Sequence, residues 1–234
     1  MSTKTAADNV HARKMDVKKM TILAMFAALG YLCLFVFRFK VSFLTLEFKD
    51  VFITMAGFVF GPLAAAGVAF AESLIEMVTL SDTGFWGAVM NFGGSATFAV
   101  TASLIYKYNK NFKGAVIGLI AAIFSMTAVM LVMNLLITPI YAHTTIDVVI
   151  GMILPLLLPF NLIKSALNAA LCFMLYKPVS QALKSVHLLP RSDDSFTVNK
   201  NTVIGLVIAA IVIVTSIVLV LSVFGGNFEL VKAK

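Results

Sequence analysis

Long apolar stretches separated by short polar segments make up most of this chain. They fall at about residues 20–37, 51–66, 64–80, 85–106, 114–140, 148–176 and 202–224. A helix that crosses the hydrocarbon core of a bilayer needs about 20 mostly apolar residues. The pattern therefore predicts an all-α polytopic membrane protein, with a six-helix core and an additional C-terminal transmembrane helix.

Turn and helix-start residues set the limits of the predicted helices. Gly61-Pro62 is typical of a turn, and it divides one long apolar stretch into two short helices. The sixth stretch contains Pro155 and Pro159, and a proline is well tolerated in the first turn of a helix. We expect the sixth helix to begin near Pro159, after a long outer connection at 135–158 with some helical content.

Polarity divides the chain into four segments. A cytoplasmic N-terminal tail is expected at 1–17, a six-helix membrane domain at 18–185, a polar cytoplasmic linker at 186–201, and the additional helix with an outer tail at 202–234. The linker is the only long polar segment in the second half of the chain. We therefore expect the last helix to be an appendage to the six-helix domain.

Composition supports a membrane protein and argues against one that binds nucleic acid. Apolar residues make up 60% of the chain and charged residues 12%, whereas about 25% of residues are charged in soluble domains. The net charge of +7 is spread over short connecting loops, as is typical of topology determinants. With the N-terminus inside, cytoplasmic segments hold twelve Lys and Arg residues and outer segments five. The bias predicts a cytoplasmic N-terminus and, with seven spans, an outer C-terminus.

Polar side chains interrupt the apolar stretches at a similar depth, near the predicted outer surface. Asp50 opens the second helix, Asn91 lies about two turns into the fourth, Asn134 lies towards the outer end of the fifth, and Asn161 and Lys164 lie in the first turns of the sixth. Ionisable and amide groups are costly inside a membrane, so each one is a candidate functional residue. Their convergence on one depth predicts a pocket.

The residue types in this predicted pocket suit a flat heteroaromatic ligand. Lys164 shares a helix face with Asn161 and Asn168, and an ammonium group near a helix start needs an acceptor from the protein or a ligand. Amides both donate and accept, which suits a ring edge that carries imide and carbonyl groups. Side chains expected to pack against the ring faces are Phe43, Phe48, Phe52, Phe92, Leu154 and Phe160.

Structural roles are open for the same side chains. A membrane asparagine is commonly an interhelical hydrogen-bonding group, Lys164 has the length to snorkel to the outer interface, and Asp50 suits a helix cap. Glu72 and Glu76, four residues apart, suit either a proton relay or catalytic pair, or carboxylates that face the outer cavity and pair with Lys or Asn there. The second interpretation is favoured, because no histidine or further carboxylate cluster accompanies them.

Other chemical signals in the chain are weak. Cys33 and Cys172 lie in apolar runs and predict no disulfide framework. The three histidines lie in tails or loops, so neither a metal nor a cofactor is expected. No GxxxxGK[ST] run is present, so an ATP-driven step would depend on other subunits. Ala24 and Ala28 form a small-residue stripe suited to close helix packing.

Several short motifs follow one another along residues 18–180. They are Phe48-Lys49-Asp50-Val51, Phe60-Gly61-Pro62-Leu63-Ala64, Asn91-Phe92, Asn134-Leu135, Pro139-Ile140-Tyr141 and Leu158-Pro159-Phe160-Asn161-Leu162-Ile163-Lys164. This series resembles the S components of energy-coupling factor (ECF) importers, and most closely the riboflavin-specific type. The last motif, with the asparagine of the fifth helix before it, carries most of that specificity.

The resemblance implies a fold and a binding site. It implies a six-helix S component that holds riboflavin or a related flavin near the outer surface, beneath the loop that joins the first two helices. In the family, the flavin ring is contacted by the groups that match Asn134, Asn161 and Lys164. The first outer loop supplies further contacts. The predicted substrate-binding residues are Asn134, Asn161, Lys164, Asn91, Asp50, Leu46 and Phe48.

The resemblance also implies a multi-pass protein of the bacterial plasma membrane that acts with partners. Ala24 and Ala28 match the small-residue motif that docks on the transmembrane coupling subunit, and two cytoplasmic ATPase subunits would drive transport. The chain itself would then be a transporter subunit and not an enzyme, with the flavin as its transported ligand.

The sequence departs from the family pattern at three places, which leaves other functions open. Lys49 stands where the family more often has serine, Glu72 lies near a position that is often basic, and the seventh helix is additional. The first two departures admit a phosphorylated or modified flavin. The alternatives are an S component for another vitamin or flat heterocycle, an intramembrane enzyme that uses Glu72 and Glu76, and a membrane scaffold without a ligand.

Overall fold

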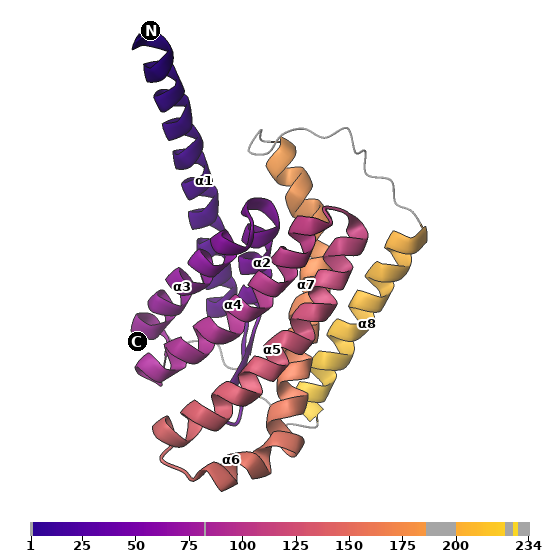
Figure 1. Cartoon of the computed structure of the whole chain (residues 1–234). Helices are drawn as coiled ribbons and strands as arrows, with labels where there is room; N and C mark the ends of the chain where they lie inside the picture. Colours follow the sequence, from indigo (N-terminus) through magenta and orange to yellow (C-terminus); the bar gives the residue numbers. More distant parts are fainter. Residues whose placement is uncertain (1, 82, 186–199, 223–226, 229–234) are drawn as a thin grey trace.

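The computed structural model of the chain is a bundle of long helices with a small sheet among them (Figure 1). It describes residues 2–81, 83–185, 200–222 and 227–228. The helices are α1 (Ser2–Val36), α2 (Lys49–Phe60), α3 (Pro62–Thr79), α4 (Gly84–Tyr108), α5 (Phe112–Tyr141), α6 (Ile146–Met152), α7 (Leu158–Ser185) and α8 (Lys200–Ser222), with a π-helical segment, η1 (Ile153–Leu157), between α6 and α7. The strands are β1 (Arg38–Val41), β2 (Leu44–Glu47) and β3 (Asn227–Phe228). The predicted all-α membrane fold with an additional C-terminal helix is confirmed.

Most of the helices have the length and composition of membrane spans. Among the described residues, the six segments that qualify are Val17–Val36, Pro62–Thr79, Gly84–Tyr108, Lys113–Tyr141, Ile146–Val179 and Val203–Ser222. The remaining core helix, α2, has 12 residues and is therefore about 18 Å long, against about 30 Å for the hydrocarbon core. It packs among α1, α3, α4 and α7, so other helices of the chain, and not lipid, cover most of its surface.

The division between α2 and α3 at Gly61 and Pro62 is confirmed. Gly61 has a φ of 94°, a backbone conformation that costs glycine little and other residues more. Pro62 occupies the first turn of α3, where its missing N–H leaves no bond unmade. The two short helices thus follow from the two residue types at the turn.

The expected long connection at 135–158 is wrong. Helix α5 continues to Tyr141 with Pro139 inside its last turn, so only residues 142–145 separate it from α6. Helical backbone then runs without a break through η1 into α7, which begins at Leu158, close to the predicted start. Pro155 lies within η1, where the wider turn accommodates a residue that would disrupt an α-helix interior.

Both ends of the chain contain regular structure outside the predicted helices. Helical backbone already begins at Ser2, within the segment expected as an N-terminal tail. The polar linker expected at 186–201 lies mostly outside the described residues, as does most of the outer tail. Near the C-terminus, β3 pairs antiparallel with β1, which gives the strand order β2-β1-β3.

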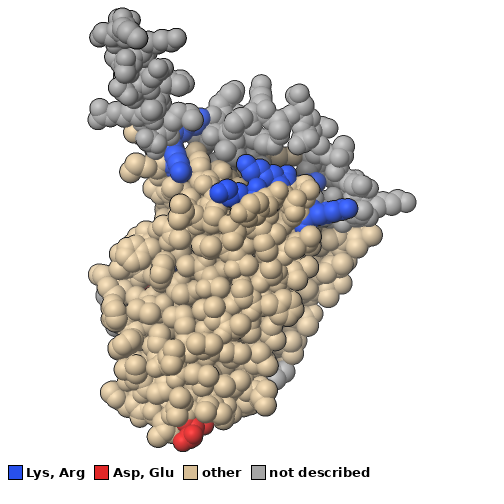
Figure 2. All heavy atoms as spheres, viewed as in Figure 1, with Lys and Arg blue, Asp and Glu red and all other residues tan. Residues whose placement is uncertain are grey.

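Basic side chains gather in a band near one end of the bundle, and acidic side chains show at the opposite end (Figure 2). The exposed or half-buried lysines on the elements at the basic end are Lys18, Lys19, Lys107, Lys110, Lys113 and Lys177. At the acidic end, Asp147 lies in the first turn of α6. The two ends of the membrane bundle therefore differ in charge.

Candidate ligand pocket

The segment that joins α1 and α2 is a β-hairpin. Strands β1 and β2 pair antiparallel, with Val41 opposite Leu44 and Arg38 opposite Glu47. The two residues between the strands form a tight turn in which Ser42 has a φ of 55°. The apolar side of the hairpin, including Leu46, packs in one cluster with residues of α6, η1 and α7. This packing holds the hairpin against one end of the bundle.

A cavity of about 260 Å³ lies between the hairpin and the ends of α3, α4, α5 and α7. Its size is near the lower end of the range for small-molecule sites, roughly 300–1,000 Å³. The lining residues are Arg38, Lys40, Ser42, Phe43, Leu44, Thr45, Glu47, Glu76, Ser81, Thr83, Gly87, Met90, Asn91, Met130, Tyr141, Phe160, Asn161 and Lys164. The lining mixes cations, carboxylates, amides and aromatic rings, so it suits a ligand with a polar edge and apolar faces.

Glu47, at the end of β2, holds Lys164 in place. The Lys164 Nζ atom lies 3.0 Å from Glu47 Oε1 and donates to the Thr45 carbonyl oxygen at 3.2 Å. Burial alone would raise the pKa of the Glu47 carboxyl, but the ammonium groups of Lys164 and Lys49 outweigh burial and lower its pKa to about 2. Glu47 is therefore charged at every ordinary pH, and it supplies the acceptor that a lysine at this depth requires.

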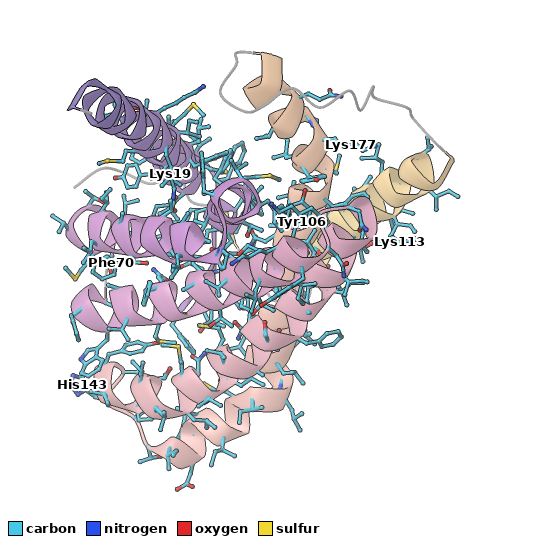
Figure 3. All side chains as sticks on the ribbon, turned by 45° about the horizontal axis from the view of Figure 1, so that its top comes forward. Lys19, Phe70, Tyr106, Lys113, His143 and Lys177 are labelled. Atoms are coloured by element: carbon cyan, nitrogen blue, oxygen red, sulfur yellow. The ribbon has the colours of Figure 1, made fainter. Side chains whose placement is uncertain are left out.

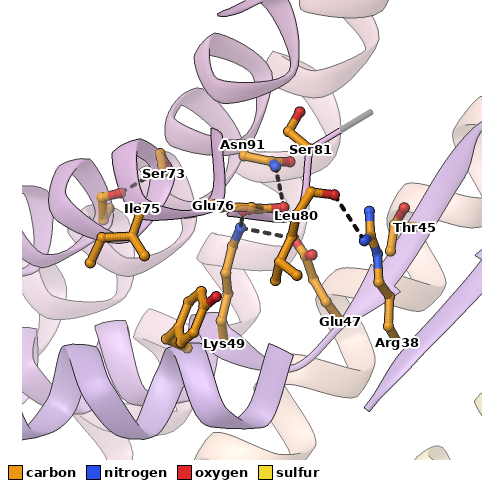
Figure 4. Close-up of polar contacts among 12 residues, drawn as sticks. Arg38, Thr45, Glu47, Lys49, Ser73, Ile75, Glu76, Leu80, Ser81 and Asn91 are labelled. Carbon is orange, nitrogen blue, oxygen red and sulfur yellow. Dashed lines mark hydrogen bonds and ion pairs between the residues drawn. The ribbon is translucent and has the colours of Figure 1, made fainter. Parts of the chain in front are cut away.

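A second lysine extends the ion-pair network behind the pocket (Figure 4). Lys49 is fully buried, and its Nζ atom lies 3.1 Å from Glu47 Oε1 and also contacts Glu76 Oε2. The Asn91 amide donates to the other oxygen of Glu76 at 2.7 Å. Ion pairs and charged hydrogen bonds, which are stronger than neutral ones, thus join the hairpin, α2, α3 and α4.

Three of the residues predicted for the site line the cavity together. These are Asn91, Asn161 and Lys164. Asn161 donates its amide N–H to the carbonyl oxygen of Leu157, the last residue of η1, at 2.7 Å. Asn168, on the same face of α7, donates to the Glu47 backbone carbonyl at 2.9 Å. The helix face predicted to carry Asn161, Lys164 and Asn168 is therefore the face that packs against the hairpin.

The other four predicted residues do not line the cavity. Asn134 is fully buried; it donates to the Met130 carbonyl and accepts from the Thr138 hydroxyl. Asp50 is fully buried in the first turn of α2, and its carboxylate oxygens accept no hydrogen bond from the residues that the structure describes. Leu46 is buried on the inner face of the hairpin, and the ring of Phe48 packs against Phe37 and Phe39.

The two glutamates of α3 have different surroundings. Glu76 pairs with lysine and asparagine, as the favoured interpretation requires. Glu72 is buried against α1, and within the described part of the chain neither of its oxygens accepts a hydrogen bond. The contact with α1 is close, since a Cβ atom at Gly30 would lie 2.2 Å from Glu72 Oε1. The pair does not form one shared site.

Ala24 and Ala28 lie on the outward face of α1. Both are exposed, whereas Ile22 and Phe26 on the other face are buried in the core. The stripe is therefore available to a partner helix and is not used for packing inside the chain.

Sequence reasoning missed Glu47, Arg38 and the hairpin itself. Arg38 donates to the Leu80 carbonyl at 3.2 Å and so links the hairpin to the end of α3. Polar and apolar side chains do alternate over residues 38–43 and again over 44–47, the signal for short strands. Glu47 lies outside the apolar stretches, so a search for polar groups within spans passes over it.

Comparison with known proteins identifies the family. The family model for the substrate-specific component of ECF transporters matches residues 18–176. This chain is an ECF transporter S component. The resemblance in the motifs is thereby confirmed, and with it the place of the chain among membrane transporter subunits.

Two curated relatives match this S component over nearly their whole length. The riboflavin transporter RibU of Staphylococcus aureus (strain TCH60) is 30% identical over 193 residues, which cover 74% of this chain and 98% of the relative. The riboflavin transporter FmnP of Bacillus subtilis (strain 168) is 26% identical over 194 residues, covering 74% of this chain and all of the relative. Each relative is thus shorter than this chain.

A solved structure of the S component of a bacterial ECF transporter has the same fold. The two structures superpose with a TM-score of 0.61 at 31% sequence identity, covering 72% of this chain and 99% of the other. Helix α8 lies beyond the residues that the family model matches. The S component described here therefore consists of the family fold and an additional helix.

Proposed function

We propose that this S component binds riboflavin in the pocket beneath the β1–β2 hairpin and delivers it across the membrane. The observation that carries the proposal is the pocket of amides, lysine and aromatic rings, in a chain that matches two riboflavin transporters over nearly their full length. The pocket opens at the end of the bundle opposite the basic band, which fits capture from the outer side.

The pocket lining complements the groups of a flavin ring. The edge of the ring carries an imide N–H between two carbonyl oxygens, and the amides of Asn91 and Asn161 both donate and accept. The Lys164 ammonium, already oriented by Glu47, is a donor for a ring carbonyl. Phe43 and Phe160 line the same cavity and are suited to pack against the flat faces of the ring.

The remaining predicted site residues are proposed at the edge of the same pocket. Asn134 lies one helical turn from Met130, which lines the cavity, and the resemblance assigns it a contact with the flavin ring. Leu46 and Phe48 shape the hairpin and its approach to α2. Asp50 is proposed to act through the buried charges of α2 and the hairpin and not by lining the cavity.

Transport is proposed to require the partners of the family. These are a transmembrane coupling subunit, docked on Ala24 and Ala28, and two cytoplasmic ATPase subunits. The exposed position of both alanines supports the docking role. The basic band supports a cytoplasmic N-terminus, since Lys and Arg favour that side. An outer C-terminus is supported by β3, which pairs with β1 at the hairpin end of the bundle.

The ligand assignment is tested by the spectrum of the purified protein. Protein purified in detergent should show flavin absorbance, and added riboflavin should quench the fluorescence of Trp86, the only tryptophan of the chain. Trp86 precedes Gly87, which lines the cavity, so it is well placed to report binding. Colourless protein with unchanged tryptophan fluorescence would refute the riboflavin proposal.

The docking role is tested separately from binding. Replacing Ala24 and Ala28 together by leucine puts branched side chains on a stripe that a partner helix approaches closely. Riboflavin uptake and co-purification of the coupling subunit should be lost, while riboflavin affinity stays unchanged. The matched control is Met25→Leu, an exposed neighbour outside the stripe; normal uptake in the double variant would refute the docking role.

A further inference from the structure

Helix α8 creates an apolar groove on the side of the bundle. It packs mainly on α7, where a Cβ atom at Gly205 would lie 2.7 Å from the Phe173 ring. Between α5, α7 and α8 there remains a groove of about 410 Å³. The lining residues are Val116, Leu119, Ile120, Ile123, Ala166, Ala169, Ala170, Phe173, Ile204, Gly205, Ile208, Ala209 and Val212.

The place of the groove in the membrane determines what kind of molecule fits it. All of its lining residues belong to segments with the length and hydropathy of membrane spans, and every one of them is apolar. On α8 the lining extends from Ile204 to Val212, a length of about 12 Å. A hydrocarbon chain from the bilayer matches this lining, whereas a polar solute has no hydrogen-bonding partner there.

Two lysines continue the groove towards the basic end of the bundle. Lys113 precedes Val116 and Ile120 at i+3 and i+7 spacing, so it lies on the face of α5 that lines the groove. Lys177 follows Phe173 by one turn on the lining face of α7. Figure 3 shows both lysines at the same end of the bundle. The apolar groove therefore has a basic mouth.

We propose that the groove binds one anionic phospholipid, with an acyl chain along α5, α7 and α8 and its phosphate group near Lys113 and Lys177. Charge complementarity at the mouth selects a lipid in preference to a partner helix. A membrane helix would need close contacts along most of its length, whereas this groove is short and its lysines lie where head groups lie. Basic pockets between membrane helices are suited to anionic head groups.

Native mass spectrometry of the detergent-purified protein tests this binding. The probes are phosphatidylglycerol and phosphatidylcholine with identical acyl chains. Wild type should retain one phosphatidylglycerol, with a preference of about fivefold for each lysine near the head group. Lys113→Gln with Lys177→Gln should reduce binding to the phosphatidylcholine level. Lys107→Gln with Lys110→Gln, equal in charge but lining a separate cavity beside α2, should keep the preference.

A second pair of variants tests the acyl part of the site. Ile208 lines the groove and is 56% exposed, whereas Ile211 is 59% exposed and does not line it. Ile208→Trp should displace both lipids, while Ile211→Trp should retain phosphatidylglycerol as wild type does. Equal retention of the two lipids by wild type, or equal losses in both lysine pairs, would overturn the proposal. The riboflavin assay is independent of these readouts.

Discussion

The two cavities of this S component have opposite chemistry. The pocket beneath the hairpin is built around buried ions, with Glu47, Lys49 and Glu76 all almost fully buried. The groove beside α8 is lined by apolar side chains alone, and its lysines lie only at the mouth. Inside a low-dielectric bundle, the first cavity must hold its charges with matched partners. None of the residues that line the groove is charged, so an apolar chain needs only a matching width there.

This difference determines how each cavity depends on the rest of the fold. Lys164 and Glu47 are 117 residues apart in the chain, and Lys49 and Glu76 are 27 apart, so the pocket exists only when hairpin, α2, α3 and α7 are assembled. The groove requires only that α8 lie against the neighbouring helices α5 and α7. Substitutions in the pocket should therefore affect stability and ligand binding together, whereas substitutions in the groove should affect neither strongly.

The largest effect is expected for Glu47→Ala. This change leaves Lys164 without its carboxylate and removes one of the two that hold Lys49, and breaking a buried ion pair typically costs about 3–5 kcal/mol. Thermal unfolding in detergent measures the loss. Glu72→Gln is the matched control, because the Glu72 carboxylate accepts no hydrogen bond from the described residues, and it should leave stability unchanged or higher. Equal destabilisation by both variants would contradict the network.

The gap in stability between wild type and Glu47→Ala should depend on pH. Pairing with Lys164 and Lys49 holds the pKa of Glu47 at about 2, below its ordinary value of 4.5. A lowered pKa in the folded state stabilises above the unfolded value and is lost as pH falls through the folded one. The gap should thus be constant above about pH 5 and shrink between 4.5 and 2. If the difference in stability already narrows between pH 8 and 6, the Glu47 carboxylate is not its cause.

A smaller effect is expected when single ligand contacts are removed. Asn161→Ala and Lys164→Ala should each weaken riboflavin binding by about 1–3 kcal/mol, or roughly 5- to 150-fold. Titration of Trp86 fluorescence gives the affinity of the folded protein, and thermal unfolding in detergent measures any accompanying loss of stability. If Glu72→Gln abolishes binding while these two variants bind normally, the ligand occupies a different pocket.

The smallest effect is expected when the groove is filled. Ile208→Trp should change riboflavin affinity by less than about twofold, because distant sites without shared partners act independently and the two cavities share no lining residue. The same fluorescence titration measures it. A large change would show that the cavities are coupled through α5 or α7, the two helices that line both.

The sequence predicts the polar parts of the pocket better than its apolar parts. Asn91, Asn161 and Lys164 are visible because an amide or ammonium group inside an apolar stretch is costly and therefore conspicuous. The pairing of Lys164 with Glu47 is not visible, because it depends on a hairpin of two four-residue strands. The groove cannot be predicted at all, because an isoleucine facing a groove and one facing lipid are the same residue in the same kind of stretch.

The fold shows the same distinction. Gly61 and Pro62 mark a helix boundary through their own backbone chemistry, so the sequence predicts the turn correctly. Pro155 and Pro159 predict an interruption that the structure replaces with continuous helical backbone. Whether a proline ends a helix or is accommodated by a wider turn depends on the surrounding packing, which the local sequence does not contain.

The π-helical segment η1 changes the direction in which the side chains of α7 point relative to those of α6, within one membrane-spanning segment. One extra residue in a helical turn rotates all later side chains by about 100° relative to an unbroken α-helix. If residues 153–157 were α-helical, Asn161 and Lys164 would lie on a different side of the helix, turned away from the hairpin. Deletion of one residue between Ile153 and Leu157 would remove that extra residue and keep Asn161 and Lys164 facing the hairpin, whereas a change of η1 to α-helix at unchanged length would turn both away.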